Sequence, residues 1–94
     1  MNLKRNIPPD VTPYFKTAAF TAETVPEKLK KAHGTKVGTW GRINVNRGEV
    51  SYFLEGEDRP LARVTAGETF VILPEERHYV RLSDDAEFFV ELCK

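Results

Sequence analysis

Turn-forming residues divide the chain from residue 36 onward into short stretches in which apolar and polar side chains alternate. Regularly spaced turns with alternation between them are typical of antiparallel β-strands. Gly, Asn, Asp and Pro mark these turns because of their backbone preferences. The turns lie at residues 46–48, 55–58, 66–67, 74–77 and 83–85. The sequence therefore predicts an all-β fold.

The chain has 94 residues, enough for one hydrophobic core, so we expect a single domain over residues 1–94. Residues 1–13 contain three prolines and mixed charge, which predicts an irregular N-terminal arm. A short extended piece around residues 14–20 is expected to follow as a strap or an edge strand.

One short helix is expected before the β region. Thr24 and Glu27 have the spacing of a helix-capping box, Pro26 falls in the first turn, and Gly34 is available as a stop. This pattern predicts a helix over about residues 25–33.

The charge balance excludes several classes of partner. Fourteen Lys and Arg match fourteen Asp and Glu, so no net field attracts nucleic acid or an anionic membrane. One cysteine excludes an internal disulfide, and no cleavable signal or long apolar run is present. We expect a cytoplasmic protein that binds neither nucleic acid nor membrane.

Alternation also predicts where a ligand site lies. His78 follows a charged turn and shares strand parity with Val80 and Leu82, so its ring is expected at the mouth of the apolar interior. Residues 70–73 and most of 88–92 are apolar on both faces of their strands, which predicts strands buried from two sides. Packing on a second subunit would explain this, so a homodimer is expected.

Four segments resemble a known family. Residues 33–45, 48–52, 74–78 and 88–91, in this order, are similar to the small cupin-like domain at the amino end of tellurite-resistance methyltransferases, the TehB amino-terminal and YeaR-like family. The resemblance covers about residues 13–92. It implies a double-stranded β-helix, or jelly-roll barrel, that is often dimeric, in bacterial cytoplasm, with a role near tellurite or other oxyanion stress.

The chain departs from this family pattern in two ways. Metal-binding cupins carry a paired His-x-His and a Glu in their first motif, whereas Thr35, Val37 and Gly41 stand here. Nothing resembles a glycine-rich nucleotide loop between a strand and a helix, so we expect no methyltransferase activity from this chain itself.

His33, His78 and Glu91 are the candidate metal ligands. Two imidazoles and one carboxylate suit a divalent transition metal such as Zn, Ni or Fe, and the resemblance implies histidine, histidine and an acidic residue at these positions. The alternative is that His33 lies at a helix end, His78 is a hydrogen-bonded turn residue, and Glu91 faces outward and pairs with a basic residue.

A small anionic ligand is the other candidate. Lys36 and Arg42 share strand parity with Trp40 and Asn44, so one face would combine positive charge with an aromatic wall. Tyr52 is a second candidate aromatic contact. Alternatively, both charges are solvated, and the two aromatic residues belong to the core or to a dimer interface.

The turn before His78 carries two further carboxylates. One of them could accept a hydrogen bond from the imidazole and fix its tautomer. We place Glu75 in the candidate site and Glu76 in solvent, because charged turns are usually hydrated.

These features favour a cupin-like module that binds a small ligand or a metal without turnover, because no nucleophile with a partner base is visible. The alternative function is a small mononuclear metalloenzyme of the dioxygenase or isomerase type, with a two-His, one-carboxylate site. A third hypothesis is a dimerising module without any site.

Overall fold

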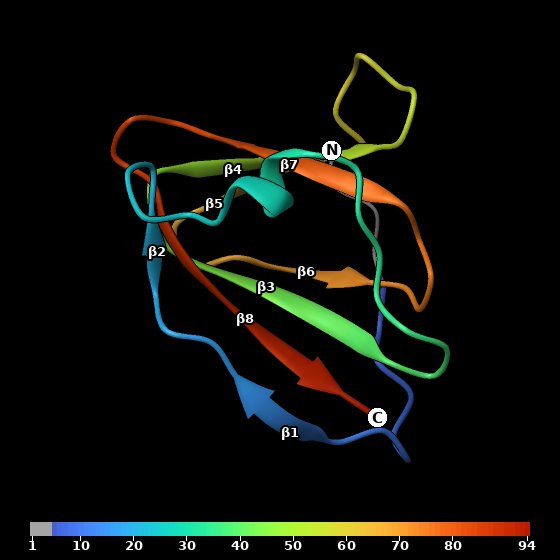
Figure 1. Ribbon diagram of the computed structural model, residues 1–94. Helices are drawn as coiled ribbons and strands as arrows, with labels where there is room; N and C mark the ends of the chain where they lie inside the picture. Colours follow the sequence, from blue (N-terminus) through green and yellow to red (C-terminus); the bar gives the residue numbers. More distant parts are fainter. Residues whose placement is uncertain (1–4) are drawn as a thin grey trace.

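The computed structural model describes residues 5–94, and it confirms the predicted all-β class (Figure 1). Every strand pair among these residues is antiparallel. In chain order the elements are β1 (Pro13–Lys16), β2 (Phe20–Thr21), η1 (Glu27–Lys30), β3 (Trp40–Arg47), β4 (Glu49–Leu54), β5 (Ala62–Thr65), β6 (Thr69–Ile72), β7 (His78–Leu82) and β8 (Glu87–Cys93).

The strands form two sheets. One sheet has the order β1-β8-β3-β6, with β2 also paired to β8, and the other has the order β5-β4-β7. Among residues 5–94, no strand pair joins β1 or β6 to β5 or β7. The edges of the two sheets therefore stay separate, and the described residues do not form a closed barrel; the jelly-roll barrel that the resemblance implies stays a prediction.

The core lies between the sheets, and on β7 it includes the face of His78 and Val80 that alternation predicted. Ile43 of β3, Tyr52 of β4 and Val80 of β7 are buried and belong to one hydrophobic cluster. Val71 is also buried, although it alternates with the core residues of β6. The N-terminal arm meets the free edge of β6, where Arg5 donates a hydrogen bond to the backbone carbonyl of Val71 at 3.1 Å.

The predicted helix over residues 25–33 is wrong. The structure has a single 3₁₀ turn at Glu27–Lys30, and the residue before it, Pro26, makes no side-chain capping bond. The hydroxyl of Thr24 instead accepts a hydrogen bond from the amide of Thr21 at 2.8 Å, so the capping box does not form. His33 then forms an isolated bridge with β7, which requires extended backbone where the helix was expected.

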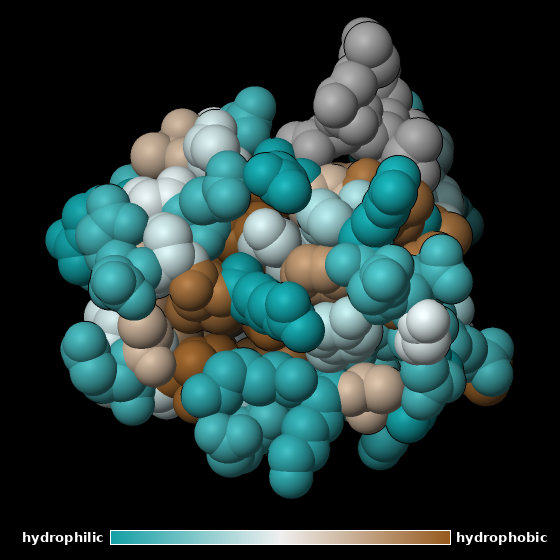
Figure 2. All heavy atoms as spheres, turned by 90° about the horizontal axis from the view of Figure 1, so that it is seen from above, coloured by the Kyte–Doolittle hydropathy of each residue, from teal (hydrophilic) through white to brown (hydrophobic). Residues whose placement is uncertain are grey.

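Within the predicted arm, residues 5–12 contain no strand or helix, Pro13 begins β1, and residues 1–4 lie outside the described part. The extended piece predicted around residues 14–20 corresponds to β1 and β2. No helix in residues 5–94 has the length and apolar character needed to cross a membrane. Seen from above, hydrophobic residues (brown) gather in a hollow that hydrophilic residues (teal) surround (Figure 2).

Cys93 ends β8 and is fully buried, and burial raises the pKa of its thiol. We predict that the native protein reacts with a thiol reagent such as 5,5′-dithiobis(2-nitrobenzoate) at least about 100-fold more slowly than the urea-unfolded chain, because attack requires the thiolate and an open structure. Equal rates in native buffer and in urea would show that the strand pair of β1 and β8 opens freely.

Candidate functional site

A pocket of about 620 Å³ lies between the two sheets, and we call it the inter-sheet pocket. Its wall includes residues of β1, β2, β3, β6, β7, β8 and η1, together with residues of the segment from His33 to Thr39. Neither β4 nor β5 contributes to it. The volume is typical of pockets that enclose small organic molecules.

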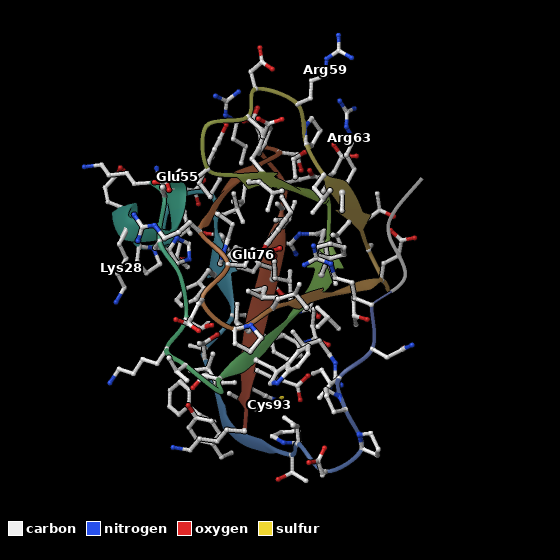
Figure 3. All side chains as sticks on the ribbon, turned by 90° about the vertical axis from the view of Figure 1, so that its right-hand side faces the viewer. Lys28, Glu55, Arg59, Arg63, Glu76 and Cys93 are labelled. Carbon is white, nitrogen blue, oxygen red and sulfur yellow. The ribbon has the colours of Figure 1, made fainter. Side chains whose placement is uncertain are left out.

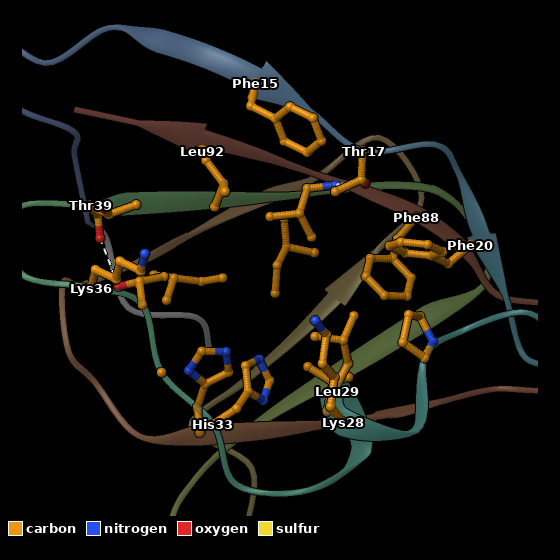
Figure 4. Close-up of a pocket in the computed structure, with 18 of the residues that line it drawn as sticks. Phe15, Thr17, Phe20, Lys28, Leu29, His33, Lys36, Thr39, Phe88 and Leu92 are labelled. Atoms are coloured by element: carbon orange, nitrogen blue, oxygen red, sulfur yellow. Dashed lines mark hydrogen bonds between the residues drawn. The ribbon is translucent and has the colours of Figure 1, made fainter.

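The inter-sheet pocket combines polar and apolar side chains. In the close-up His33, Lys36 and Thr39 lie on one side and Phe20 and Phe88 on the other, with Leu29 and Lys28 next to each other between them (Figure 4). The pocket therefore offers hydrogen-bonding groups together with aromatic and aliphatic surface.

His33 and His78, which we call the histidine pair, stand side by side in the pocket wall. Their backbones exchange two hydrogen bonds, from the His33 amide to the His78 carbonyl at 2.9 Å and in reverse at 2.8 Å. Their ring centroids are 4.2 Å apart. The predicted meeting of two imidazoles that are distant in sequence is confirmed, and the mechanism is this isolated β-bridge.

Both imidazoles are held by backbone carbonyls. Nδ1 of His33 lies 2.9 Å from the carbonyl oxygen of Lys31, and Nδ1 of His78 lies 2.8 Å from that of Glu76. A carbonyl oxygen only accepts, so each Nδ1 carries the proton. In a neutral ring this leaves Nε2 of each residue with a free lone pair. The histidine pair therefore presents two hydrogen-bond acceptors.

Burial keeps His78 neutral. Its side chain is 2% exposed, and burial lowers its pKa to about 4. The neighbouring His33 and the Arg5 cation act in the same direction, while the carbonyl and the carboxylate of Glu76 oppose them. At neutral pH His78 is therefore an acceptor at Nε2 and carries no charge.

A buried polar cluster of Arg5, Glu76 and Tyr52 lies behind the histidine pair. Arg5 and Glu76 form a two-pronged ion pair with N–O distances of 2.7 and 3.0 Å, and their side chains are only 13% and 16% exposed. The hydroxyl of Tyr52 donates to the same carboxylate at 2.6 Å. The Tyr52 ring in turn stacks on His78, with ring centroids 4.7 Å apart. The cluster thus supports the histidine pair from the core.

The electrostatics of this cluster favour a charged Glu76. Burial would raise the pKa of Glu76, but hydrogen bonds from Arg5 and Tyr52 outweigh burial and lower it. Burial and the bond to Glu76 raise the pKa of the Tyr52 hydroxyl, which stays a donor. A carboxylate with a guanidinium and a phenol as partners is stable in this half-buried position.

The two turn carboxylates lie opposite to our prediction, which placed Glu75 in the candidate site and Glu76 in solvent. Glu75 is exposed, has left-handed backbone with φ of 62°, and does not line the pocket. Glu76, which we placed in solvent, lies toward the centre of the molecule (Figure 3). It orients His78 through its backbone carbonyl instead of its carboxylate. Its partner Arg5 is 71 residues away, so no local pattern could have indicated the pair.

Glu91 does not join the histidine pair. Its neighbours Val90 and Leu92 line the pocket, so strand alternation turns Glu91 to the other face of β8. There it pairs with Arg42 at 3.2 Å and accepts a bond from Asn44 at 3.0 Å. This is the outward-facing role that we kept as the alternative to metal ligation.

The predicted cationic face is also divided. Lys36 lines the inter-sheet pocket, whereas Arg42 points to the opposite side of the sheet. Trp40 has the parity of Arg42 and does not line the pocket. Tyr52 is buried in the cluster behind His78 and does not reach the pocket wall either. Of the five predicted ligand contacts, only Lys36 is in position, and ligand binding by it stays a prediction.

The donor set does not complete the predicted metal site. Two imidazole nitrogens are in reach of one another, but residues 5–94 contain no group of three His, Cys, Asp or Glu side chains that could hold a metal. Catalytic zinc sites use three protein ligands, and non-haem iron sites use two histidines and a carboxylate. The described residues therefore do not fit a mononuclear metalloenzyme centre.

Hydroxyl groups in the pocket wall are engaged with the backbone. Thr35 donates to the carbonyl of Thr39 at 2.7 Å, and Thr17 donates to the carbonyl of Ala18 at 2.8 Å. Neither hydroxyl hydrogen bonds to an imidazole, and the two imidazole hydrogen bonds of the described residues go to backbone carbonyls.

Sequence reasoning missed most of the pocket wall. Phe20, Leu29 and Phe88 were not singled out, and β8 gave no clear signal because Phe88, Phe89 and Val90 are apolar on both of its faces. The residues from β1 and β2 carried no such signal, because exposed short strands have weak patterns.

Comparisons with known proteins agree with one another. The family model described as TehB-like domain matches residues 16–90. The probable S-adenosyl-L-methionine-dependent methyltransferase TehB of Haemophilus influenzae strain 10810 is 30% identical over 79 residues, which is 79% of this chain and 28% of that protein. The chain thus spans less than a third of the length of this relative.

Two solved structures share the fold. A crystal structure of a protein from E. coli strain K12 has a TM-score of 0.85 at 24% identity, with 97% of each chain covered. The crystal structure of TehB from Haemophilus influenzae has a TM-score of 0.73 at 24% identity, covering 90% of this chain and 32% of that one.

Proposed function

Because this chain belongs to the TehB-like domain family, we propose that it is a ligand-binding module that holds a small molecule in the inter-sheet pocket without transforming it. The observation that carries the proposal is the histidine pair: both residues line a pocket of about 620 Å³, and backbone carbonyls fix both rings through Nδ1. A mostly apolar pocket with a few fixed polar groups is typical of small-molecule sites.

We link this module to tellurite or other oxyanion stress through its family. The curated relative is named as a methyltransferase, but this chain covers 28% of it. We assign methyl transfer to the remainder of such proteins and ligand binding to this domain. Lys36 supports an anionic ligand or an anionic substituent, because it lines the pocket and carries a positive charge.

We also propose that the two sheets are an open form of the cupin-like double-stranded β-helix. The distribution of strands supports this, since β3, β6 and β8 lie in one sheet while β4, β5 and β7 lie in the other. A homodimer stays a prediction. The metalloenzyme alternative has no support in the geometry, because Glu91 faces away from the histidine pair.

A fluorescent pocket probe tests the proposal. N-phenyl-1-naphthylamine, which brightens in apolar surroundings, is expected to bind with one site per chain in the micromolar range. The variant Val90→Trp, which fills the pocket from β8, is expected to weaken binding at least about tenfold.

The neighbouring variant Phe89→Trp is the matched control. It places the same ring on the same strand, but Phe89 alternates with the pocket residues and does not line the pocket. Binding equal to that of the parent protein is expected. Absence of saturable binding, or equal binding by both variants, would refute the inter-sheet pocket as a ligand site.

A further inference from the structure

The lining of the inter-sheet pocket indicates the size and polarity of its ligand. Leu29, Phe20 and Phe88 form much of one side, and further apolar wall comes from Phe15 and Leu92. A bare oxyanion would fill a small part of 620 Å³ and would leave these side chains in contact with water. Apolar surface gains stability only when an apolar group covers it. The body of the ligand must therefore be organic.

The histidine pair indicates the chemistry of the ligand's polar group. Both Nδ1 protons are already donated to the carbonyls of Lys31 and Glu76, so in its neutral form each ring offers only the acceptor Nε2. Among residues 5–94, no hydrogen-bond partner satisfies Nε2 of either ring. A group that fits here brings a hydrogen of its own, as a hydroxyl or an amide does.

Charge excludes one large class of donors. No Asp or Glu lines the pocket in the described part of the chain, whereas Lys28 and Lys36 both do. An organic ammonium would lack a counter-ion and would meet two cations. The ligand is therefore uncharged or anionic.

We propose, resting on the proposed function, that the ligand is an organic molecule with an apolar body and a hydrogen-bond-donating head, such as a phenol or an alcohol. The head donates to Nε2 of the histidine pair, and the body packs on Leu29, Phe20 and Phe88. An acidic substituent on such a molecule is accepted next to Lys36.

Three competitors of the bound N-phenyl-1-naphthylamine test this inference: 1-naphthol, 1-methoxynaphthalene and sodium tellurite. The two naphthalenes share one ring system, but only 1-naphthol can donate a hydrogen bond. We expect 1-naphthol to displace the probe at a concentration at least about tenfold lower than 1-methoxynaphthalene, and tellurite not to displace it.

Imidazole ¹⁵N spectra locate the head group. The chain has two histidines, so a His33→Phe variant assigns both sets of signals. On addition of 1-naphthol we expect an upfield shift of at least one Nε2 resonance, and no such shift with 1-methoxynaphthalene. A His33→Gln variant, whose amide oxygen still accepts, is expected to prefer 1-naphthol more strongly than His33→Phe does.

The outcomes distinguish a failure of the proposed ligand chemistry from a failure of the proposed ligand-binding function. Equal displacement by both naphthalenes with no change at Nε2 would overturn the donating head. Displacement by tellurite and not by 1-naphthol would overturn the organic class while leaving a ligand site in place. If N-phenyl-1-naphthylamine itself does not bind, the proposed function fails first.

Discussion

Replacing Glu76 with alanine is expected to lower the free energy of unfolding by about 3 kcal/mol, because it leaves a buried guanidinium and a buried phenol without their acceptor. Arg5 and Tyr52 both donate to this carboxylate, at distances of 2.6 to 3.0 Å. Both side chains of the ion pair are less than one-fifth exposed, so water replaces the lost bonds poorly. Urea denaturation at neutral pH measures the change.

Glu75→Ala is the matched control for this experiment. The Glu75 side chain is exposed, and the change is expected to stay within about 0.5 kcal/mol. Glu76→Gln is expected to lie between the two alanine variants, since its amide oxygen still accepts a bond. Equal stability of Glu75→Ala and Glu76→Ala would contradict the buried cluster and would detach the N-terminal arm from the core.

The fold was largely predictable because its signals are local. Turn residues and alternation located the strands from β3 onward, and they indicated correctly that His78 and Val80 face the interior. The failed helix shows the limit of local signals. Thr24 and Glu27 have the spacing of a capping box, yet the bridge between His33 and His78 imposes extended backbone on the segment that follows Lys30.

The site was predictable only in part, because β8 is apolar on both faces. Phe89 and Val90 are equally hydrophobic, so the pattern could not tell which of them faces the pocket or where Glu91 points. Arg5 and Glu76 meet across 71 positions, and the sequence contains no periodicity that connects an irregular arm with a distant turn. His78 was located by its strand parity, whereas His33 was singled out through the family resemblance and had been placed at the end of the predicted helix.

Acidification from pH about 7.5 to about 4.5 is expected to destabilise the fold by about 2.5 kcal/mol through His78 alone. Burial lowers the pKa of His78 in the folded state to about 4, compared with about 6.5 in the unfolded chain. Between these values the unfolded chain binds a proton that the folded chain excludes. The contribution is therefore fully present above pH 6.5 and is lost as the pH falls towards 4.

A His78→Phe variant isolates this effect. Phenylalanine retains a ring against Tyr52 but cannot titrate and loses the bond to the Glu76 carbonyl, so a loss of about 1 kcal/mol is expected at pH about 7.5. As the pH falls, this difference should shrink and then reverse in sign. Protonation of Glu76 also destabilises the fold. Because the pKa of Glu76 is lowered in the folded state, that loss of stability falls below its ordinary pKa of 4.5, outside the pH range measured. If the stability of the two proteins changed with pH in the same way, His78 would take up its proton in the folded state at no cost. The structure argues against this, because the ring is held between Tyr52, His33 and the Arg5–Glu76 pair.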